Sequence, residues 1–451
     1  MTMATDDRAV STGAAGIATP PTFGEATRAF ARIGLLSFGG PAGQIALMHK
    51  VLVDERRWLD EPRFLHALNY CMFLPGPEAM QLATYVGWLL HGVRGGLVAG
   101  LLFVLPGALL IVALSAVYLS FGEVPLIAGL LFGLKAAVLA VVLEALIRVS
   151  KRALRDRSMV AIAIAAFIAI ALLRLPFPLI ILAAALAGAA SHAMRPSMSV
   201  GEAKSDTAIQ DMPSWTRPSR SRFITTLAVW SALWLLPLAA FHFVAAGGSV
   251  YTAEAWFFSK MATVTFGGAY AVLAYVAQQA VEVHGWLRAD EMLTGLGLAE
   301  TTPGPLILVL VFVGFLGGAR FSGLEPLIGG LGGAAVALWF TFVPCFLWVF
   351  VGAPYVETVR NVRWLAAALS AVTAAVVGVI ANLALWFSLH VLFASVGEVG
   401  AGPLVLPVPE LASFDAPAFV IALGAATAMI GFRVNLVVVL AVAALAGAVA
   451  G

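Results

Sequence analysis

Long apolar segments recur along this chain, and they constrain its fold more than any other feature. Apolar residues make up 61% of the 451 residues and charged residues 11%, whereas a soluble domain carries about 25% charged residues. Many segments are long enough to cross a hydrocarbon core of about 30 Å, and they lack the alternation of a transmembrane barrel. The sequence therefore predicts an all-α, polytopic integral membrane protein embedded in a lipid bilayer.

The apolar pattern divides the chain into transmembrane or re-entrant helices, about 10–13 in number. The predicted segments are 23–48, 64–91, 95–121, 125–147, 158–175, 177–194, 223–246, 252–280, 290–318, 323–352, 364–390, 417–431 and 434–450. Segments that contain Gly-Gly or Pro-Gly-Pro either span the bilayer or re-enter it, and the re-entrant alternative lowers the number of spans.

Composition excludes several kinds of site. The net charge of +2 gives no reason to expect a nucleic-acid partner. Cys71 and Cys345 lie in separate apolar segments without metal-ligand spacing, so we interpret them as small buried side chains rather than a disulfide or metal site. We expect no metal, no cofactor and no catalytic residue.

Three motifs repeat at one gapless offset of 228 residues, and a later match needs a larger offset. The pairs are Phe38-Gly39-Gly40 with Phe266-Gly267-Gly268, Trp58-Leu59 with Trp286-Leu287, Pro75-Gly76-Pro77 with Pro303-Gly304-Pro305, and, at an offset of 238, Pro106 with Pro344. The sequence therefore predicts two homologous halves.

Five regions follow from this repeat. They are a disordered cytoplasmic tail (1–21) without the apolar core of a signal peptide, an N-terminal transporter repeat (22–194), a basic cytoplasmic linker (195–222), an extra transmembrane helix (223–249) and a C-terminal transporter repeat (250–451).

Charge indicates that the second repeat is inverted. The loop 148–157 is basic, as is the linker 195–222, and positive loops stay in the cytoplasm. The loop 391–416, which is the counterpart of 148–157, contains acids but no Lys or Arg. Inverted repeats are typical of secondary transporters, whose sites lie at the midplane. The basic segment 49–63 is outside if 23–48 spans and inside if 23–48 is re-entrant, and the sequence leaves both open.

Breaks inside apolar helices predict the substrate site. Irregular backbone in a membrane must be satisfied by protein, water or ligand, and a helix N-terminus is suited to an anion. The alternative is that Pro-Gly-Pro only kinks a helix and that Gly pairs only allow close packing. The candidate substrate-binding residues are Phe38, Gly39, Gly40, Gln44, Pro75, Gly76, Pro77, Gln81, Thr265, Gly267, Gly268, Thr301, Thr302, Pro303, Gly304 and Pro305.

Three ionisable residues inside apolar stretches are candidates for charge or proton coupling, because such residues are costly in a membrane. They are Glu78, Lys135 and Glu300. For Lys135, the alternatives are a counter-charge for the anion, a snorkelling side chain and a pair with another helix.

The stretches "SFGGPAGQ", "FLPGPEAMQLATYVGWLLHG" and "GGLVAGLLFVLPG" resemble the chromate ion transporter family in its long, two-domain form. The resemblance implies a multi-pass protein of the bacterial inner membrane that exports chromate, confers chromate resistance and uses the proton-motive force. The sequence contains no Walker-type loop, so it gives no indication that ATP is the energy source. Glu78 becomes Leu306 in the second half, so the halves are not expected to bind substrate equally.

Other functions remain open at this stage. A carrier of sulfate or another tetrahedral oxyanion is the main alternative. An intramembrane enzyme such as a chromate reductase is a distant one, because the chain lacks a dinucleotide fingerprint, Cys-x-x-Cys and a haem-attachment motif. A channel or flippase fits inverted repeats less well. A homodimer is one assembly that the sequence allows.

Overall fold

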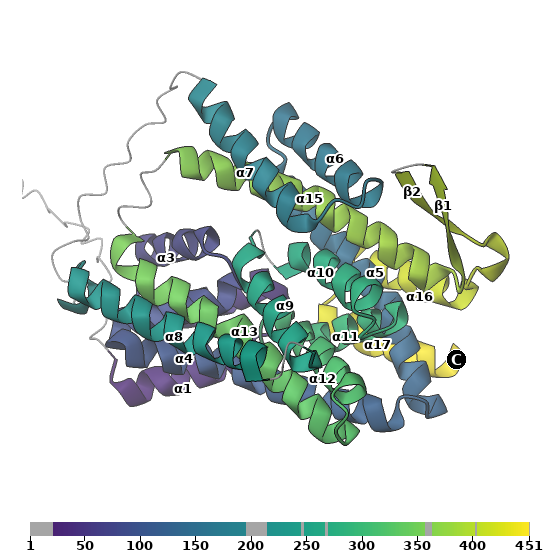
Figure 1. Cartoon of the computed structure of the whole chain (residues 1–451), viewed down its shortest axis with the longest axis horizontal. Coiled ribbons are helices and arrows are strands. Elements are labelled where there is room, and N and C mark those ends of the chain that lie inside the picture. Colours follow the sequence, from purple (N-terminus) through teal and green to yellow (C-terminus); the bar gives the residue numbers. More distant parts are fainter. Residues whose placement is uncertain are drawn as a thin grey trace, which may run out of the picture.

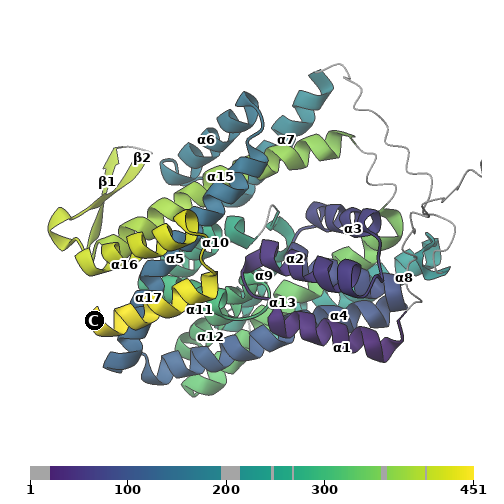
Figure 2. The same ribbon diagram turned by 180° about the vertical axis from the view of Figure 1, so that it is seen from behind.

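The computed structural model describes residues 21–194, 214–244, 248–266, 269–356, 363–401 and 404–450. Helices dominate these residues, as the sequence predicts (Figures 1 and 2). The helices of the first repeat are α1 (Phe23–Leu36), α2 (Gly40–His49), α3 (Glu61–Phe73), α4 (Glu78–Phe121), α5 (Pro125–Ala153), α6 (Arg157–Ala171) and α7 (Phe177–Met194).

The second part of the chain begins with α8, which is the extra helix predicted between the repeats. The helices are α8 (Arg220–Val244), α9 (Val250–Val264), α10 (Ala269–Ala277), α11 (Ala289–Thr301), α12 (Val309–Phe321), α13 (Pro326–Gly352), α15 (Arg363–Leu392), α16 (Ala416–Ala426) and α17 (Leu436–Ala450). Gly267 and Gly268 lie outside the described residues.

Five helices within the described residues are long and apolar enough to cross a membrane. They begin at Glu78, Pro125, Arg220, Pro326 and Trp364. Several predicted crossings are instead pairs of shorter helices.

The helix α4 is two antiparallel arms rather than one rod. A straight helix of its 44 residues would be about 66 Å long, twice the apolar thickness of a bilayer. The backbone leaves the helical region at His91 and Gly92, and a Cβ on Gly87 would lie 2.4 Å from the carbonyl oxygen of Gly95. The first arm (78–90) and second arm (93–121) therefore pack back to back through glycine.

Helical hairpins turn at the first Phe-Gly-Gly and at the second Pro-Gly-Pro. The chain reverses between α1 and α2, because Arg32 pairs with Glu55 at 3.3 Å beyond α2. It also reverses at the second Pro-Gly-Pro, since Arg320 at the end of α12 pairs with Glu291 at the start of α11. The segment 23–48 is therefore a hairpin rather than one continuous helix, and the segment 49–60 lies beside α1.

The two repeats exchange their long helices. Helix α15 of the second repeat packs against α6 and α7 of the first, while α5 of the first packs against α16 and α17 of the second. Helices α5 and α15 also contact each other, and both views show them near the centre of this bundle (Figures 1 and 2).

A small β-hairpin departs from the all-helical prediction. Strands β1 (Val396–Ala401) and β2 (Leu404–Pro409) pair antiparallel and project from the end of α15 (Figure 1). Their valines and leucines favour an extended backbone, which helix-period arguments did not detect in this loop.

Candidate functional site

A cavity of about 450 Å³ lies where the hairpin tips meet α5 and α15; we call it the first cavity. Pro41 at the start of α2, Glu78 at the start of α4 and Tyr270 at the start of α10 reach it from the tips. The N-termini of three helices therefore point to one space, and each carries partial positive charge and amide hydrogens without an intrahelical acceptor.

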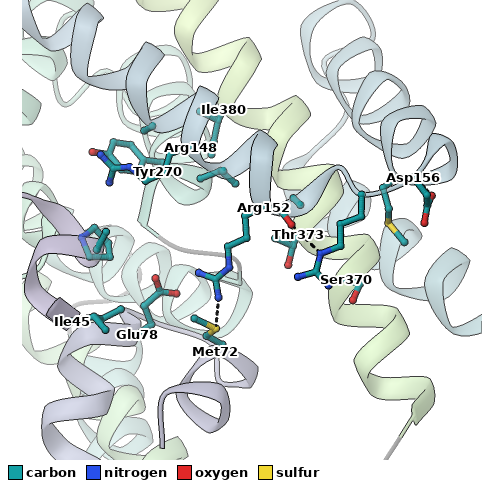
Figure 3. Close-up of a pocket in the computed structure, with 17 residues that line it drawn as sticks. Ile45, Met72, Glu78, Arg148, Arg152, Asp156, Tyr270, Ser370, Thr373 and Ile380 are labelled. Carbon is teal, nitrogen blue, oxygen red and sulfur yellow. Dashed lines mark hydrogen bonds between the residues drawn. The ribbon is translucent and has the colours of Figure 1, made fainter. Parts of the chain in front are cut away.

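Three arginines, two in the last turns of α5 and one just after it, line the same cavity. They are Arg148, Arg152 and Arg155. The guanidinium of Arg152 donates to the sulfur of Met72 at 3.0 Å, which is a weak acceptor. Figure 3 shows this guanidinium and the Glu78 carboxylate projecting into the same space from opposite sides. Arg152 is thus placed to exchange a weak partner for an anion.

The lining carries both signs of charge. Glu78 and Asp156 oppose the three arginines, and Arg148 pairs with Glu144 on its own helix. Ser370 and Thr373 of α15 line the far wall, and their hydroxyls donate to carbonyls of the same helix. The cavity therefore has a net excess of guanidinium groups, which is the chemistry that recognises an oxyanion.

A buried tyrosine connects the cavity with a buried acid. The hydroxyl of Tyr270 donates to Oε1 of Glu300 at 2.6 Å, and both side chains are buried. Arg148 lies next to Tyr270 on the cavity side (Figure 3). Glu300, one of the predicted coupling residues, is therefore one hydrogen bond away from the first cavity.

The repeated motifs bind each other across the pseudo-symmetric centre. The amide of Gly76 donates to the carbonyl oxygen of Thr265 at 2.8 Å, and the amide of Gly304 donates to that of Ser37 at 2.9 Å. Both donors and both acceptors are related by the offset of 228. Each Pro-Gly-Pro turn is thus closed by the backbone that precedes Phe-Gly-Gly in the other repeat.

These hydrogen bonds between the repeats change the role expected for the Pro-Gly-Pro helix breaks. The sequence suggested that Gly76 and Gly304 leave amides free for substrate, but both amides are satisfied by protein. Their positive φ angles of 125° and 97° explain why glycine is required. The amides left for a ligand are those of the first helical turns, such as the turn that begins at Glu78.

Most predicted binding residues support the cavity from behind. The side-chain amide of Gln44 donates to the carbonyl of Gly304 at 2.6 Å, and that of Gln81 donates to Pro75 at 2.7 Å. The hydroxyls of Thr265, Thr301 and Thr302 donate to carbonyls of their own helices. None of the predicted binding residues in the described part of the chain lines the first cavity, whereas Glu78, which was predicted as a coupling residue, lines it directly.

Lys135 lies elsewhere, in contact with another helix. Its Nζ is 3.3 Å from Oδ2 of Asp290 at the start of α11. The alternative of a pair with another helix is the one that the structure adopts, and Lys135 is not among the residues that line the first cavity.

Sequence reasoning missed the arginines, Tyr270 and the α15 hydroxyls. The run 148–157 was interpreted only as a signal of membrane orientation, although its spacing of four residues between Arg148 and Arg152 places both on one helix face. Tyr270 lies two residues after the second Phe-Gly-Gly, so the motif itself pointed to this position.

Comparison with known proteins agrees with this architecture. The family model described as "Chromate transporter" matches residues 24–189 and 253–448, one match for each repeat. A chromate transport protein of Pseudomonas aeruginosa is 29% identical over 363 residues, covering 80% of this chain and 80% of that protein. One from Cupriavidus metallidurans is 24% identical, covering 82% and 84%.

A probable chromate transport protein of Synechococcus elongatus is 26% identical, covering 79% of this chain and 82% of that protein. No solved structure matches the chain. Since the family model covers most of the sequence in two matching halves, this chain belongs to the chromate transporter family.

Proposed function

We propose that this protein exports chromate from the bacterial cytoplasm across the inner membrane, is driven by the proton-motive force, and so confers chromate resistance. The observation that carries the proposal is the first cavity, where Arg148, Arg152 and Arg155 face three helix N-termini. Membership of the family supports chromate as the substrate.

The cavity meets the main physical requirement for a doubly charged ligand. Removing a charge from water costs several kcal/mol even after relaxation, so a dianion needs several charge-assisted donors. A guanidinium group offers two parallel N–H donors to an oxyanion, and the first turns of α2 and α4 add backbone amides. Chromate would compete with Glu78 and Met72 for these donors.

Orientation follows from the basic segments. The end of α5 is basic and belongs on the cytoplasmic side, so the first cavity would open to the cytoplasm. Because α1 and α2 reverse, the basic segment 49–63 falls on this side as well. The N-terminus and the linker 195–222 are placed there too, and α8 then inverts the second repeat.

Energetics favour export as the direction of net movement. Moving one charge across the membrane is worth about 2.3 kcal/mol per 100 mV, so a dianion leaving a negative interior gains about 4.6 kcal/mol. Glu78 at the hairpin tip and Glu300 behind Tyr270 are the proposed proton carriers. Protonation of either carboxylate would weaken its electrostatic attraction to the nearby arginine. That arginine would then be available to bind the anion.

Sulfate or another tetrahedral oxyanion is the second candidate substrate. The first cavity offers charge and hydrogen-bond donors, and these groups alone do not distinguish chromate from sulfate. We therefore expect sulfate to compete with chromate, at an affinity that the size of the cavity sets.

Everted membrane vesicles test the proposal. They should accumulate radiolabelled chromate when energised, and an uncoupler should abolish the accumulation. Accumulation that an uncoupler does not affect would contradict proton-motive coupling. Vesicles without the protein are the control, and competition by unlabelled sulfate measures selectivity.

A further inference from the structure

A second cavity of about 170 Å³ lies at the opposite ends of the same helices. Lys135 of α5, His390 of α15, Asp290 of α11 and Asp415 before α16 line it. Helix α5 contributes Arg152 to the first cavity and Lys135 to the second, 17 residues apart, which is about 26 Å along a helix.

The two cavities are related by the internal repeat. The offset of 238 that matches Pro106 with Pro344 also matches lining residues of one cavity with lining residues of the other. These pairs are Phe132 with Ser370, Lys135 with Thr373, Arg152 with His390, Ala153 with Val391, and Arg155 with Phe393.

Helix caps give an independent match. Asp156 caps the N-terminus of α6 and lines the first cavity, while Asp415 caps the N-terminus of α16 and lines the second. The third residues after these caps, Met159 and Ala418, line the same two cavities. The second cavity is thus the image of the first under the pseudo-symmetry of the repeats.

The charge of the lining residues differs between the two cavities. At the offset of 238 the three arginines of the first cavity correspond to Trp386, His390 and Phe393, which are all aromatic, and of these His390 and Phe393 line the second cavity. The added cation, Lys135, is paired with Asp290 at 3.3 Å, and Asp415 adds another negative group. The charged lining residues sum to a positive value in the first cavity and a negative value in the second.

Depth differs as well. The first cavity reaches the hairpin tips at Pro41 and Glu78, while the described residues that line the second include no tip residue. Between them α11 packs closely on α5, where a Cβ on Gly297 would lie 2.7 Å from Leu134 and 3.2 Å from Val138. Helices α11 and α5 are therefore in tight contact one helical turn beyond Leu293, which lines the second cavity.

We infer that the second cavity is the release site for the same oxyanion. Its affinity is low because aromatic residues replace the arginines and because Lys135 is paired with Asp290. The inference rests on the proposed function, since it assigns the far side of the same transport path. In the conformation observed, the loading cavity reaches the hairpin tips, whereas the described residues that line the release cavity do not. The asymmetry sets the affinity on each side, while the ion gradients alone set the final accumulation ratio.

The variant His390→Arg tests the inference by restoring an arginine at the image of Arg152. In everted vesicles, chromate enclosed in the lumen should inhibit transport of His390→Arg at a concentration about tenfold lower than for the unaltered protein, as a new charge-assisted contact predicts. The KM for chromate outside the vesicle should stay unchanged. The matched variant Arg152→His should raise that KM and leave inhibition from the lumen unchanged.

A second variant covers the case in which His390→Arg does not fold. Asp290→Asn removes the carboxylate that occupies Lys135, so it should also increase inhibition from the lumen, and the further change Lys135→Gln should cancel the increase. Unchanged inhibition in whichever of these variants folds would overturn the inference while leaving chromate export intact. Absence of transport by the unaltered protein would instead overturn the proposed function.

Discussion

The hydroxyl of Tyr270 lies 2.6 Å from Oε1 of Glu300, and this hydrogen bond connects the wall of the first cavity with a fully enclosed acid. Glu300 is 3% exposed, so an ionisable group lies one hydrogen bond from the cavity while it is nearly excluded from water. The pair is therefore a second route, besides Glu78 in the cavity wall, by which a proton could alter anion binding.

Replacing Glu300 with Gln should separate coupling from binding. The amide keeps the size and an acceptor for Tyr270 but does not exchange a proton. We expect proton-driven accumulation of chromate to fall to the level seen with an uncoupler, while chromate–chromate exchange continues. Tyr270→Phe should weaken both processes, whereas Tyr251→Phe, which loses a hydroxyl bonded to Gly329 far from the cavity, should weaken neither. Normal accumulation by Glu300→Gln would remove Glu300 from the coupling mechanism.

Replacing Gly76 with Ala should abolish transport. Its φ of 125° disfavours any side chain, and a Cβ would lie 2.8 Å from both the Cys345 sulfur and the Gln81 side chain. Gly323→Ala is the matched control, because Gly323 also has a positive φ, of 73°, but nothing lies within 4 Å of its Cβ position. Transport assays with equal amounts of inserted protein make the comparison. Equal activity of both variants would reduce the Pro-Gly-Pro turn to a packing feature.

Gly107→Ala should destabilise the protein. A Cβ there would lie 1.9 Å from the backbone carbonyl oxygen of Pro303, and overpacking against rigid backbone costs about 1–3 kcal/mol. Gly424→Ala, with nothing within 4 Å of its Cβ position, should instead be neutral or gain up to about 1 kcal/mol of helix propensity. Thermal unfolding in detergent measures both. A midpoint for Gly107→Ala at or above that of the unaltered protein would show that the second break tolerates movement.

Cysteine labelling should place Arg57→Cys and Lys151→Cys on one membrane face and Gly400→Cys on the other. The prediction follows from the reversal of α1 and α2 and from the inverted second repeat. The native Cys71 and Cys345 are buried, so background labelling by a membrane-impermeant maleimide should be low. Labelling of position 57 from the face of position 400 would make 23–48 a full span and contradict the orientation proposed here.

His49 should stabilise the protein more in acid than in alkali. Its hydrogen bond to Glu61, outside the five long apolar helices, raises the pKa of His49 above its ordinary value of 6.5 despite partial burial. A group whose pKa is raised on folding contributes stability below its unfolded pKa, and this contribution disappears as pH rises through the folded pKa. The variant His49→Gln should therefore lower the thermal midpoint at pH 5.5 and change it little at pH 9. A loss that is equal at both pH values would assign the effect to packing.

Sequence predicted the architecture but not the hydrogen bonding at its centre. The offset of 228 located both sets of hairpin tips, because only glycine and proline suit such turns and a duplicated fold keeps them in register. It did not show that the Gly76 amide would reach Thr265, since that contact depends on how two repeats pack. Arg152 was visible as a charge near a membrane face, yet its role in a cavity requires the position of Met72 and Glu78, which come from another hairpin.

Lys135 shows the same limit of prediction from sequence. Its place in an apolar helix marked it as unusual, but its partner Asp290 is 155 residues away, and no local pattern connects them. Periodicity also favoured long crossings where the chain makes hairpins, because a re-entrant pair and a single span have the same apolar composition.

The reciprocal bonds from Gly76 to Thr265 and from Gly304 to Ser37 have a consequence for how such a protein could have arisen. A polypeptide that contained one half alone would lack the carbonyl that completes its own turn. It would therefore need a second copy inserted beside it with the opposite membrane orientation. Fusion of the two halves through one additional helix makes this antiparallel pairing obligatory. It also removes the need for one sequence to insert into the membrane in both orientations.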